Sequence, residues 1–154
     1  MISDKIKTLS KLARLRQLWA WEGKKVVFTN GVFDIFHAGH AYILEKSRNL
    51  GDVLIVGLNK DASARRLGKG PQRPINKWKD RAAVLCAMSA VDAVIGFEEN
   101  TPAAIMEKIR PDIFVKGGDW RKKDLAEGKF AEKIVIIPLK KGYSTTSLVR
   151  RLKP

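Results

Sequence analysis

The first apolar pattern along the chain has helical spacing. An apolar residue recurs every three or four positions as far as residue 19, and lysines and arginines lie between these positions. The recurring residues are Ile6, Leu9, Leu12, Leu15 and Trp19. This pattern predicts an amphipathic N-terminal helix within residues 1–22, with Ser3 or Asp4 as its N-cap.

Short, continuous apolar runs then alternate with helical segments. Such runs are typical of strands that are buried on both faces of a parallel sheet. The predicted strands are Val26–Phe28, Val53–Leu58, Ala93–Phe97, Ile113–Val115 and Ile134–Ile137. Helices are predicted at 41–46, 79–90, 101–110, 122–132 and 144–152, the third with Thr101 as its N-cap. The alternation predicts an α/β fold of the Rossmann-like type, a mostly parallel five-stranded sheet with helices on both faces.

Length and composition fit one globular domain over residues 1–154, with no second domain such as a kinase. Apolar residues make up 45% of the chain and charged residues 30%, and no apolar run is long enough to span a membrane. The N-terminus lacks the apolar core of a signal peptide, and the single cysteine, Cys86, excludes an internal disulfide framework. We therefore expect a cytoplasmic protein without a membrane partner.

The net charge of +14 allows a polyanionic partner, either nucleic acid or a small molecule with several phosphates. The basic residues gather in the first predicted helix, between residues 60 and 81, and in the C-terminal third. No DNA- or RNA-binding motif accompanies them, and charged helix faces are usually only solvated. Charge alone leaves a basic nucleic-acid-binding module open as an alternative function.

Both histidines of the chain lie in one turn between a predicted strand and a predicted helix. His37 and His40 are three residues apart, with Gly39 between them. Backbone N–H groups converge where a strand leads into a helix, and the helix dipole favours negative charge there. This placement suggests phosphate chemistry. A metal site that includes Asp34, or two neighbouring surface residues, remain open alternatives at this point.

Three later segments carry chemistry suited to phosphates or nucleotides. Residues 142–146 place hydroxyls at a predicted helix start, 115–120 combine a glycine pair with two charges, and 65–74 form a basic, glycine-rich loop. The ordinary alternatives are a helix cap, a polar turn and a surface loop. Segment 115–120 follows a strand, as the histidine turn does, and ligands bind at that edge of a parallel sheet. Neither a dinucleotide-binding fingerprint nor a P-loop occurs at the histidine turn, so the phosphate device is of another kind.

The segments together resemble one family. They are Gly31-x-Phe33-Asp34-x-x-His37-x-Gly39-His40, Gly57-x-Asn59-x-Asp61, Arg73-Pro74, Lys116-Gly117-Gly118-Asp119 and Gly142-x-Ser144-Thr145-Thr146. Over residues 24–152 the chain resembles the cytidylyltransferase-like nucleotidyltransferases that carry the His-x-Gly-His motif. The first, fourth and fifth segments resemble more closely the branch that acts on heptose 1-phosphate.

The resemblance implies transfer of AMP from ATP to D-glycero-β-D-manno-heptose 1-phosphate, which yields ADP-heptose and pyrophosphate for the heptose of the lipopolysaccharide core. His37 and His40 would be the catalytic residues, as hydrogen-bond donors to the triphosphate rather than metal ligands. The implied nucleotide- and phosphate-binding residues are Thr29, Asn30, Gly31, Phe33, Gly39, Arg73, Lys116, Gly117, Asp119, Ser144, Thr145 and Thr146, and possible substrate-binding residues are Asp34, Asn59, Asp61 and Lys69.

The resemblance also implies partners and a cofactor. Mg²⁺ is expected to arrive with ATP, without a metal site made by the protein itself, and relatives of this kind tend to be homodimers. Family members often join this domain to a sugar kinase, and from this sequence we expect no kinase segment; residues 121–133 are shorter and more basic than the usual pattern. The alternative within enzymes is a cytidylyltransferase that acts on glycerol 3-phosphate or a similar phosphorylated alcohol.

Overall fold

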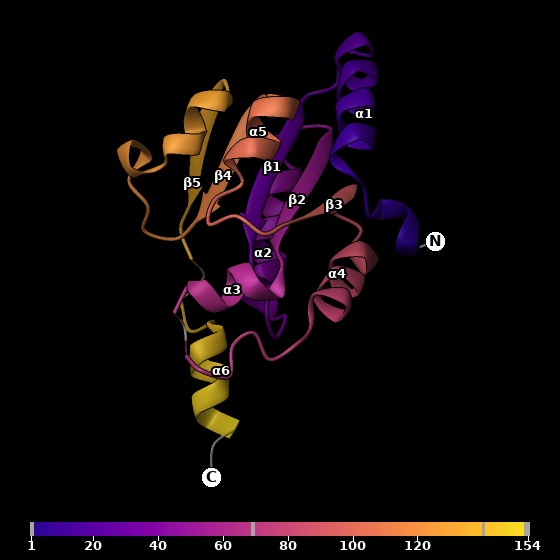
Figure 1. The fold of residues 1–154 in the computed structure, drawn as a ribbon. Coiled ribbons are helices and arrows are strands. Elements are labelled where there is room, and N and C mark those ends of the chain that lie inside the picture. The colour runs from indigo at the N-terminus through magenta and orange to yellow at the C-terminus, as the bar shows by residue number, and fades with distance from the viewer. Residues whose placement is uncertain (1, 69, 140, 153–154) are drawn as a thin grey trace.

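Five strands form one parallel sheet at the centre of the fold (Figure 1). In the computed structural model, which describes residues 2–68, 70–139 and 141–152, the strands are β1 (Val26–Gly31), β2 (Val53–Asn59), β3 (Ala93–Phe97), β4 (Ile113–Gly117) and β5 (Lys133–Ile137). Their order across the sheet is β3-β2-β1-β4-β5, and every neighbouring pair is parallel. The predicted Rossmann-like architecture is confirmed, with all five strands parallel.

The two faces of the sheet each bury an apolar layer, because successive strand residues point to opposite sides. Val27 and Leu54 belong to the layer on one face, whereas Val26, Phe28 and Ile55 belong to the layer on the other. Every residue of β2 is buried. This double burial explains why the strands appear in the sequence as unbroken apolar runs.

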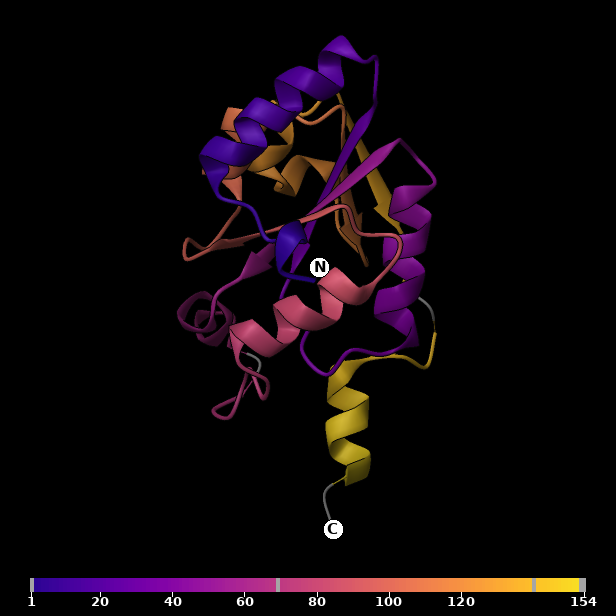
Figure 2. The ribbon, with the colours of Figure 1, turned by 90° about the vertical axis from the view of Figure 1, so that its right-hand side faces the viewer.

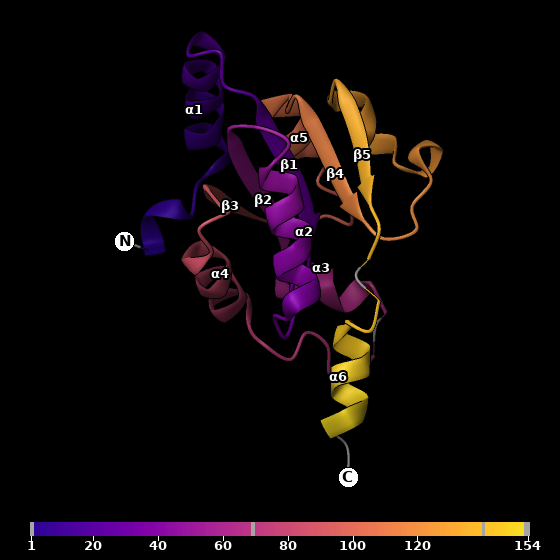
Figure 3. The same cartoon turned by 180° about the vertical axis from the view of Figure 1, so that it is seen from behind.

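Helices cover both faces of the sheet (Figures 1 and 3). The helices are α1 (Leu9–Trp21), α2 (Ala38–Arg48), α3 (Asp61–Arg66), α4 (Trp78–Ala87), α5 (Ala103–Ile109) and α6 (Thr145–Leu152), with 3-10 helices η1 (Ile2–Lys5), η2 (Lys122–Asp124) and η3 (Ala126–Phe130). Residues of α2 and α4 pack in one apolar layer, and residues of α1 and α5 pack in the other. Within the described residues no helix is both long and apolar enough to span a membrane.

The N-terminal segment closes one edge of the sheet before the first α-helix begins. Ile6 forms a parallel bridge with Val94 of β3, and the backbone N–H of Lys7 donates to the Val94 carbonyl at 2.9 Å. Because this pairing holds the chain extended, the helix starts at Leu9, and Thr8 is its N-cap. The predicted N-caps at Ser3 and Asp4, and a helix running through residues 1–22, are therefore wrong.

Other differences from the predicted elements lie outside the sheet. Helix α5 starts at Ala103, and Pro102 occupies the N-cap position without a side-chain hydrogen bond, so Thr101 is not the cap. The predicted helix at 122–132 is replaced by two short 3-10 helices. Gly128 packs directly against the Ile134 side chain of β5, which holds this segment close to the sheet edge. Helix α3 was not predicted.

The carboxyl ends of the strands share one edge, at the bottom of Figure 1. Helices α3 and α6 lie at this edge, and Figure 2 shows α6 extending from it away from the sheet. The loops that follow β1, β2 and β4 therefore open toward the same region. This is the region in which parallel α/β sheets bind ligands.

Gly57 allows the centre of the sheet to pack, because the Phe28 ring of the neighbouring strand lies over it. A Cβ atom at position 57 would lie 2.6 Å from the Phe28 Cζ atom. We expect Gly57→Ala to lower the free energy of unfolding by about 1–3 kcal/mol through overpacking. In a Phe28→Leu background the same change should be less costly, because the shorter side chain leaves room. Urea unfolding of the two single variants and the double variant measures this coupling; strictly additive effects would contradict the contact as the cause.

Candidate functional site

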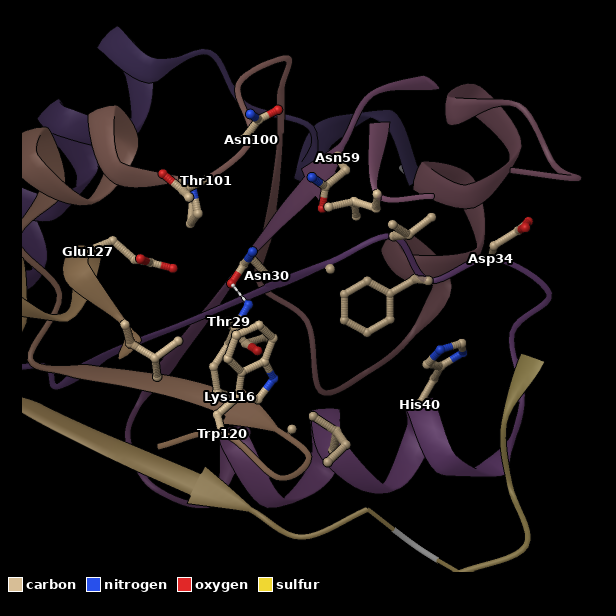
Figure 4. Close-up of a pocket in the computed structure, with 18 of the residues that line it drawn as sticks. Thr29, Asn30, Asp34, His40, Asn59, Asn100, Thr101, Lys116, Trp120 and Glu127 are labelled. Atoms are coloured by element: carbon tan, nitrogen blue, oxygen red, sulfur yellow. Dashed lines mark hydrogen bonds between the residues drawn. The ribbon is translucent and has the colours of Figure 1, made fainter. Parts of the chain in front are cut away.

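A cavity of about 580 Å³ opens at the carboxyl edge of the sheet (Figure 4). Its volume lies within the range of about 300–1,000 Å³ that is usual for small-molecule sites. Most of the residues predicted to form the site line it. They are Thr29, Asn30, Gly31, Phe33, Asp34, His40, Asn59, Arg73, Lys116, Gly117 and Thr145. Segments more than 100 residues apart in the sequence thus meet around one space.

The remaining predicted site residues do not line this cavity. They are His37, Gly39, Asp61, Asp119, Ser144 and Thr146. His37 and Gly39 support a lining residue, since the His37 ring stacks on that of His40. Asp119 and Thr146 are exposed. Lys69 lies outside the described residues.

The two histidine rings form a stacked pair at the start of α2. Their centroids are 3.8 Å apart with an interplanar angle of 23°. His37 is the N-cap of α2, and its Nδ1 accepts a hydrogen bond from the Gly39 backbone N–H at 3.0 Å. Burial lowers the pKa of His37, which favours the neutral ring. With Nδ1 as the acceptor, the neutral His37 ring carries its proton on Nε2 and can donate from there.

Gly39 is required by the close packing of this turn. A Cβ atom at position 39 would lie 2.8 Å from Cε1 of the His37 ring and 3.1 Å from the Cβ atom of Tyr143. A side chain here would therefore displace the capping histidine or the segment before α6. The glycine of the His-x-Gly-His motif thus has a packing reason within the protein itself.

Asp34 is a buried carboxylate that joins the histidine turn to the loop before α4. It is 2% exposed and accepts hydrogen bonds from Arg73 Nε at 2.8 Å and from the backbone N–H groups of Ile75 and Asn76 at 2.8 and 3.0 Å. Burial tends to raise the pKa of Asp34, but these hydrogen bonds and the Arg73 charge outweigh it and hold that pKa below its usual value. In Figure 4 the carboxylate points away from the middle of the cavity.

Arg81 is a buried cation that the sequence analysis did not identify. This residue of α4 is 2% exposed, and its guanidinium donates to the carbonyls of Val32, Asn59 and Asn76 at 2.7–3.0 Å. It also pairs with Asp61 at 2.7 Å. Arg81 lies four positions before the buried Leu85, so its place on the apolar face of the helix was the signal in the sequence.

Lys116 lies in the middle of the cavity. Its ammonium group donates to Asn30 Oδ1 at 3.0 Å and sits 4.9 Å from the centroid of the Trp120 ring, within cation–π range. Thr29 Oγ1 donates to the Val115 carbonyl at 3.0 Å, which ties β1 to β4 beside it. These contacts hold one positive charge among groups that line the site.

The start of α6 is attached to the histidine turn. Thr145 Oγ1 donates to the Asp34 carbonyl at 2.8 Å, so the hydroxyl bridges residues 111 positions apart. Ser144 Oγ accepts from the Ser147 backbone N–H at 3.0 Å, as an N-cap does. A helix of eight residues therefore begins beside the cavity, with the positive end of its dipole there.

Four polar residues that line the cavity were not predicted either, and one of them is Asp124 of η2. The others are Asn100, Thr101 and Glu127, and the first two follow β3. The sequence marked Thr101 only as a helix N-cap, and no spacing or motif marked Asn100, in the loop after β3, or Glu127, in the 3-10 helix η3. Among the described residues, no group of three or more His, Cys, Asp or Glu side chains is arranged to hold a metal ion.

Residues 28–151 match the family described as Cytidylyltransferase-like. The bifunctional protein HldE of Helicobacter pylori (strain Shi470) is 46% identical over 142 residues, which cover 92% of this chain and 30% of that protein. The same-named protein of Campylobacter curvus (strain 525.92) is 52% identical over 130 residues, which cover 84% of this chain and 28% of that protein. The chain thus spans about three tenths of the length of the curated relatives it matches.

Two solved structures are similar in fold. The lipopolysaccharide core biosynthesis protein from Thermoplasma volcanium GSS1 is 30% identical, with a TM-score of 0.65 over 79% of this chain and 100% of that chain. Pantoate-beta-alanine ligase from Francisella tularensis, complexed with beta-gamma ATP and beta-alanine, has a TM-score of 0.66 over 96% of this chain and 73% of that chain. At 16% identity the second likeness concerns the fold alone.

The Asp34 network predicts a specific response to acid. The pKa of Asp34 is lower in the folded protein than in the unfolded chain, so its stabilising contribution is present above about pH 4 and is lost as the pH falls through the folded value. We expect Asp34→Asn to lower the free energy of unfolding at pH 7 by about 3 kcal/mol, because Arg73 loses its buried partner. The variant should also lose less of its remaining stability than the wild type below pH 4.

Urea unfolding between about pH 2 and 7 measures both effects. The matched control is Glu98→Gln, which removes one partner of an exposed ion pair with Lys60 and should change stability by less than about 1 kcal/mol. An Asp34→Asn variant as stable as this control would contradict the assigned role of the buried carboxylate.

Proposed function

The chain belongs to the cytidylyltransferase-like family, and from this membership we propose that it is an adenylyltransferase. It transfers AMP from ATP to a sugar 1-phosphate, D-glycero-β-D-manno-heptose 1-phosphate, and releases pyrophosphate. The product, ADP-heptose, supplies heptose for the lipopolysaccharide core. The choice of acceptor rests on the resemblance of the Thr29–Asp34, Lys116–Asp119 and Gly142–Thr146 segments to the heptose branch.

One observation supports the proposal most. A single cavity is lined by the turn after β1, by His40, by Lys116 and Gly117 at the end of β4, and by Thr145 at the start of α6. These are the segments that the family resemblance connects with triphosphate, base and ribose. The similarity to the lipopolysaccharide core biosynthesis protein from Thermoplasma volcanium supports the proposed pathway.

The proposed reaction is a substitution at the α-phosphorus of ATP. An oxygen of the acceptor phosphate forms the new bond to this phosphorus, and the bond to the oxygen that bridges the α- and β-phosphates breaks. Pyrophosphate leaves with the bonding electrons. Such transfers depend mainly on positioning the reactants and on stabilising negative charge on the phosphate oxygens.

In this mechanism His40 and His37 donate hydrogen bonds to phosphate oxygens as charge moves toward the leaving pyrophosphate. His40 lines the cavity, and His37 stacks on it with Nε2 as its donor. Preorganised donors of this kind stabilise the transition state because they need no reorientation during the reaction. Neither histidine acts as a nucleophile.

The other proposed contacts follow from the positions around the cavity. Lys116 and the N-terminus of α6 at Thr145 contribute positive potential near the phosphates. The part of the cavity proposed for the nucleotide is lined by Thr29, Asn30, Gly31, Phe33 and Gly117. The side nearer α4 is lined by Arg73 and Asn59. Four further residues have an indirect role, because they hold neighbouring groups in position. They are Asp34, Asp61, Gly39 and Ser144.

We propose that Mg²⁺ binds with the triphosphate rather than at a site made by the protein. The described residues provide no cluster of three His, Cys, Asp or Glu side chains near one another, and Mg²⁺ commonly binds through substrate phosphates. When bound, the ion neutralises phosphate charge. The homodimer and the cytoplasmic location expected from the sequence stay predictions.

A comparison of four substrate pairs tests the proposed activity. Heptose 1-phosphate and glycerol 3-phosphate are each offered with ATP and with CTP, and pyrophosphate release is followed. We expect rapid release with ATP and heptose 1-phosphate and the slowest release with CTP and glycerol 3-phosphate. Preference for the second pair would instead identify a cytidylyltransferase for a phosphorylated alcohol, and no release in any pair would contradict nucleotidyl transfer.

Substitution of either histidine should reduce turnover strongly. We expect His37→Ala and His40→Ala each to lower kcat by about 10²–10³, the usual effect of losing one preorganised donor. Circular dichroism should show an unchanged fold. Lys46→Ala, on the exposed face of the same helix, is the matched control and should retain full turnover. Near-normal turnover in both histidine variants would exclude the proposed role.

A further inference from the structure

The cavity has two chemically different ends. Near α2 and α6 it is lined by His40, Arg73 and Thr145, groups that suit phosphate. At the opposite end it is lined by Glu127 and Thr101. Figure 4 shows the side chains of Glu127, Thr101 and Asn30 around the same space, far from His40. Besides Asp34, the acidic residues that line the cavity are Asp124 and Glu127, and the Lys116 ammonium group lies 3.0 Å from Asn30 Oδ1.

Glu127 is the unexplained group at this end. The residue is 7% exposed, and among the described residues its carboxylate has no hydrogen-bond or ion-pair partner. The Glu127 carboxylate oxygens are not among the fully buried side-chain atoms that lack a partner in the described part of the chain, so they are accessible from the cavity that the residue lines. Asp34, the other buried carboxylate that lines the cavity, accepts three hydrogen bonds from the protein. Glu127 therefore differs from Asp34 in having its acceptor capacity left for a ligand.

The neighbours of Glu127 narrow the chemistry of that ligand. The Thr101 hydroxyl can both donate and accept a hydrogen bond. The Asn100 Oδ1 atom accepts from Arg66 Nε at 2.9 Å, so the amide NH₂ group of Asn100 remains as a donor. An acceptor, a donor and a group that is both suit a ligand with several hydroxyls, because each hydroxyl also donates and accepts.

We propose that Glu127, together with Thr101 and Asn100, is the hydroxyl-binding end of the acceptor site and selects a polyhydroxylated sugar phosphate. This inference rests on the proposed function, because it takes the other end of the cavity as the place of phosphate transfer. The sugar phosphate then lies along the cavity, with its phosphate toward His40 and its hydroxyls toward Glu127. Glu127 is a specificity-determining residue in this arrangement, and the nucleotide does not depend on it.

Equilibrium binding tests the proposal without requiring turnover. Isothermal titration calorimetry is carried out on the full chain with heptose 1-phosphate and, separately, with ATP. The proteins are the wild type, Glu127→Gln, Glu127→Ala and the control Glu132→Gln, which removes an exposed charge from the same segment. We expect Glu127→Ala to weaken heptose 1-phosphate binding by about tenfold to a hundredfold and to leave ATP binding within about twofold. The control should match the wild type for both ligands.

Thermal unfolding provides a second readout that separates binding from support of the fold. Glu127→Gln keeps the shape of the residue and removes its charge, and it breaks no hydrogen bond or ion pair that Glu127 makes with the described residues. We expect its Tm to equal or exceed that of the wild type while sugar phosphate binding weakens. A lower Tm would identify Glu127 as a residue held by the fold, and would overturn the proposal.

Two binding results would also overturn it. Unchanged heptose 1-phosphate affinity in Glu127→Ala, or no binding of this ligand by the wild type, would remove the hydroxyl site. An equal loss of ATP affinity would show that the carboxylate holds the amino group of the nucleotide base instead. Failure of the proposed function is recognised separately, as absence of pyrophosphate release by the wild type with ATP and heptose 1-phosphate.

Discussion

The candidate site depends on one buried anion, the carboxylate of Asp34. It fixes the loop at residues 73–76 through Arg73 and two backbone N–H groups, while its own carbonyl receives the Thr145 hydroxyl. Phe33 and Ile35 on either side have positive φ angles of 49° and 47°, a conformation that is unfavourable for side chains of this size. The turn is therefore held in shape by its hydrogen bonds rather than by local preference.

Arg81 is a buried positive charge near the same loops. It binds the carbonyl groups at the end of β2, in the histidine turn and in the loop before α4. Asp34 and Arg81 thus hold the same two loops from different sides, and each has several partners. Buried charges of this kind tolerate little displacement, because any lost partner leaves a desolvated charge. They give a rigid wall to a cavity whose opposite end, at Asn100 and Thr101, is exposed.

Whether a feature could be predicted from the sequence depends on whether local residues or distant contacts determine it. Strands buried on both faces leave unbroken apolar runs, so β2 and β3 were predicted nearly to the residue. The carboxyl ends of β1 and β4 share an edge, so the sequence also predicted that the histidine turn and Lys116 lie together. Features that depend on distant contacts were not predicted. The pairing of Ile6 with β3 determines where α1 starts. The burial of Glu127 and the partners of Arg81 correspond to no local sequence pattern.

The stacked histidines also limit the charge of the site. Two protonated rings with centroids 3.8 Å apart would repel each other by about 4 kcal/mol at an effective dielectric constant of about 20. Burial also lowers the pKa of His37, which favours its neutral ring, so this histidine contributes a hydrogen-bond donor rather than a second positive charge. Since the Arg73 charge is balanced by Asp34, Lys116 is, among the described residues that line the cavity, the other cation that could offset the charge of a polyphosphate.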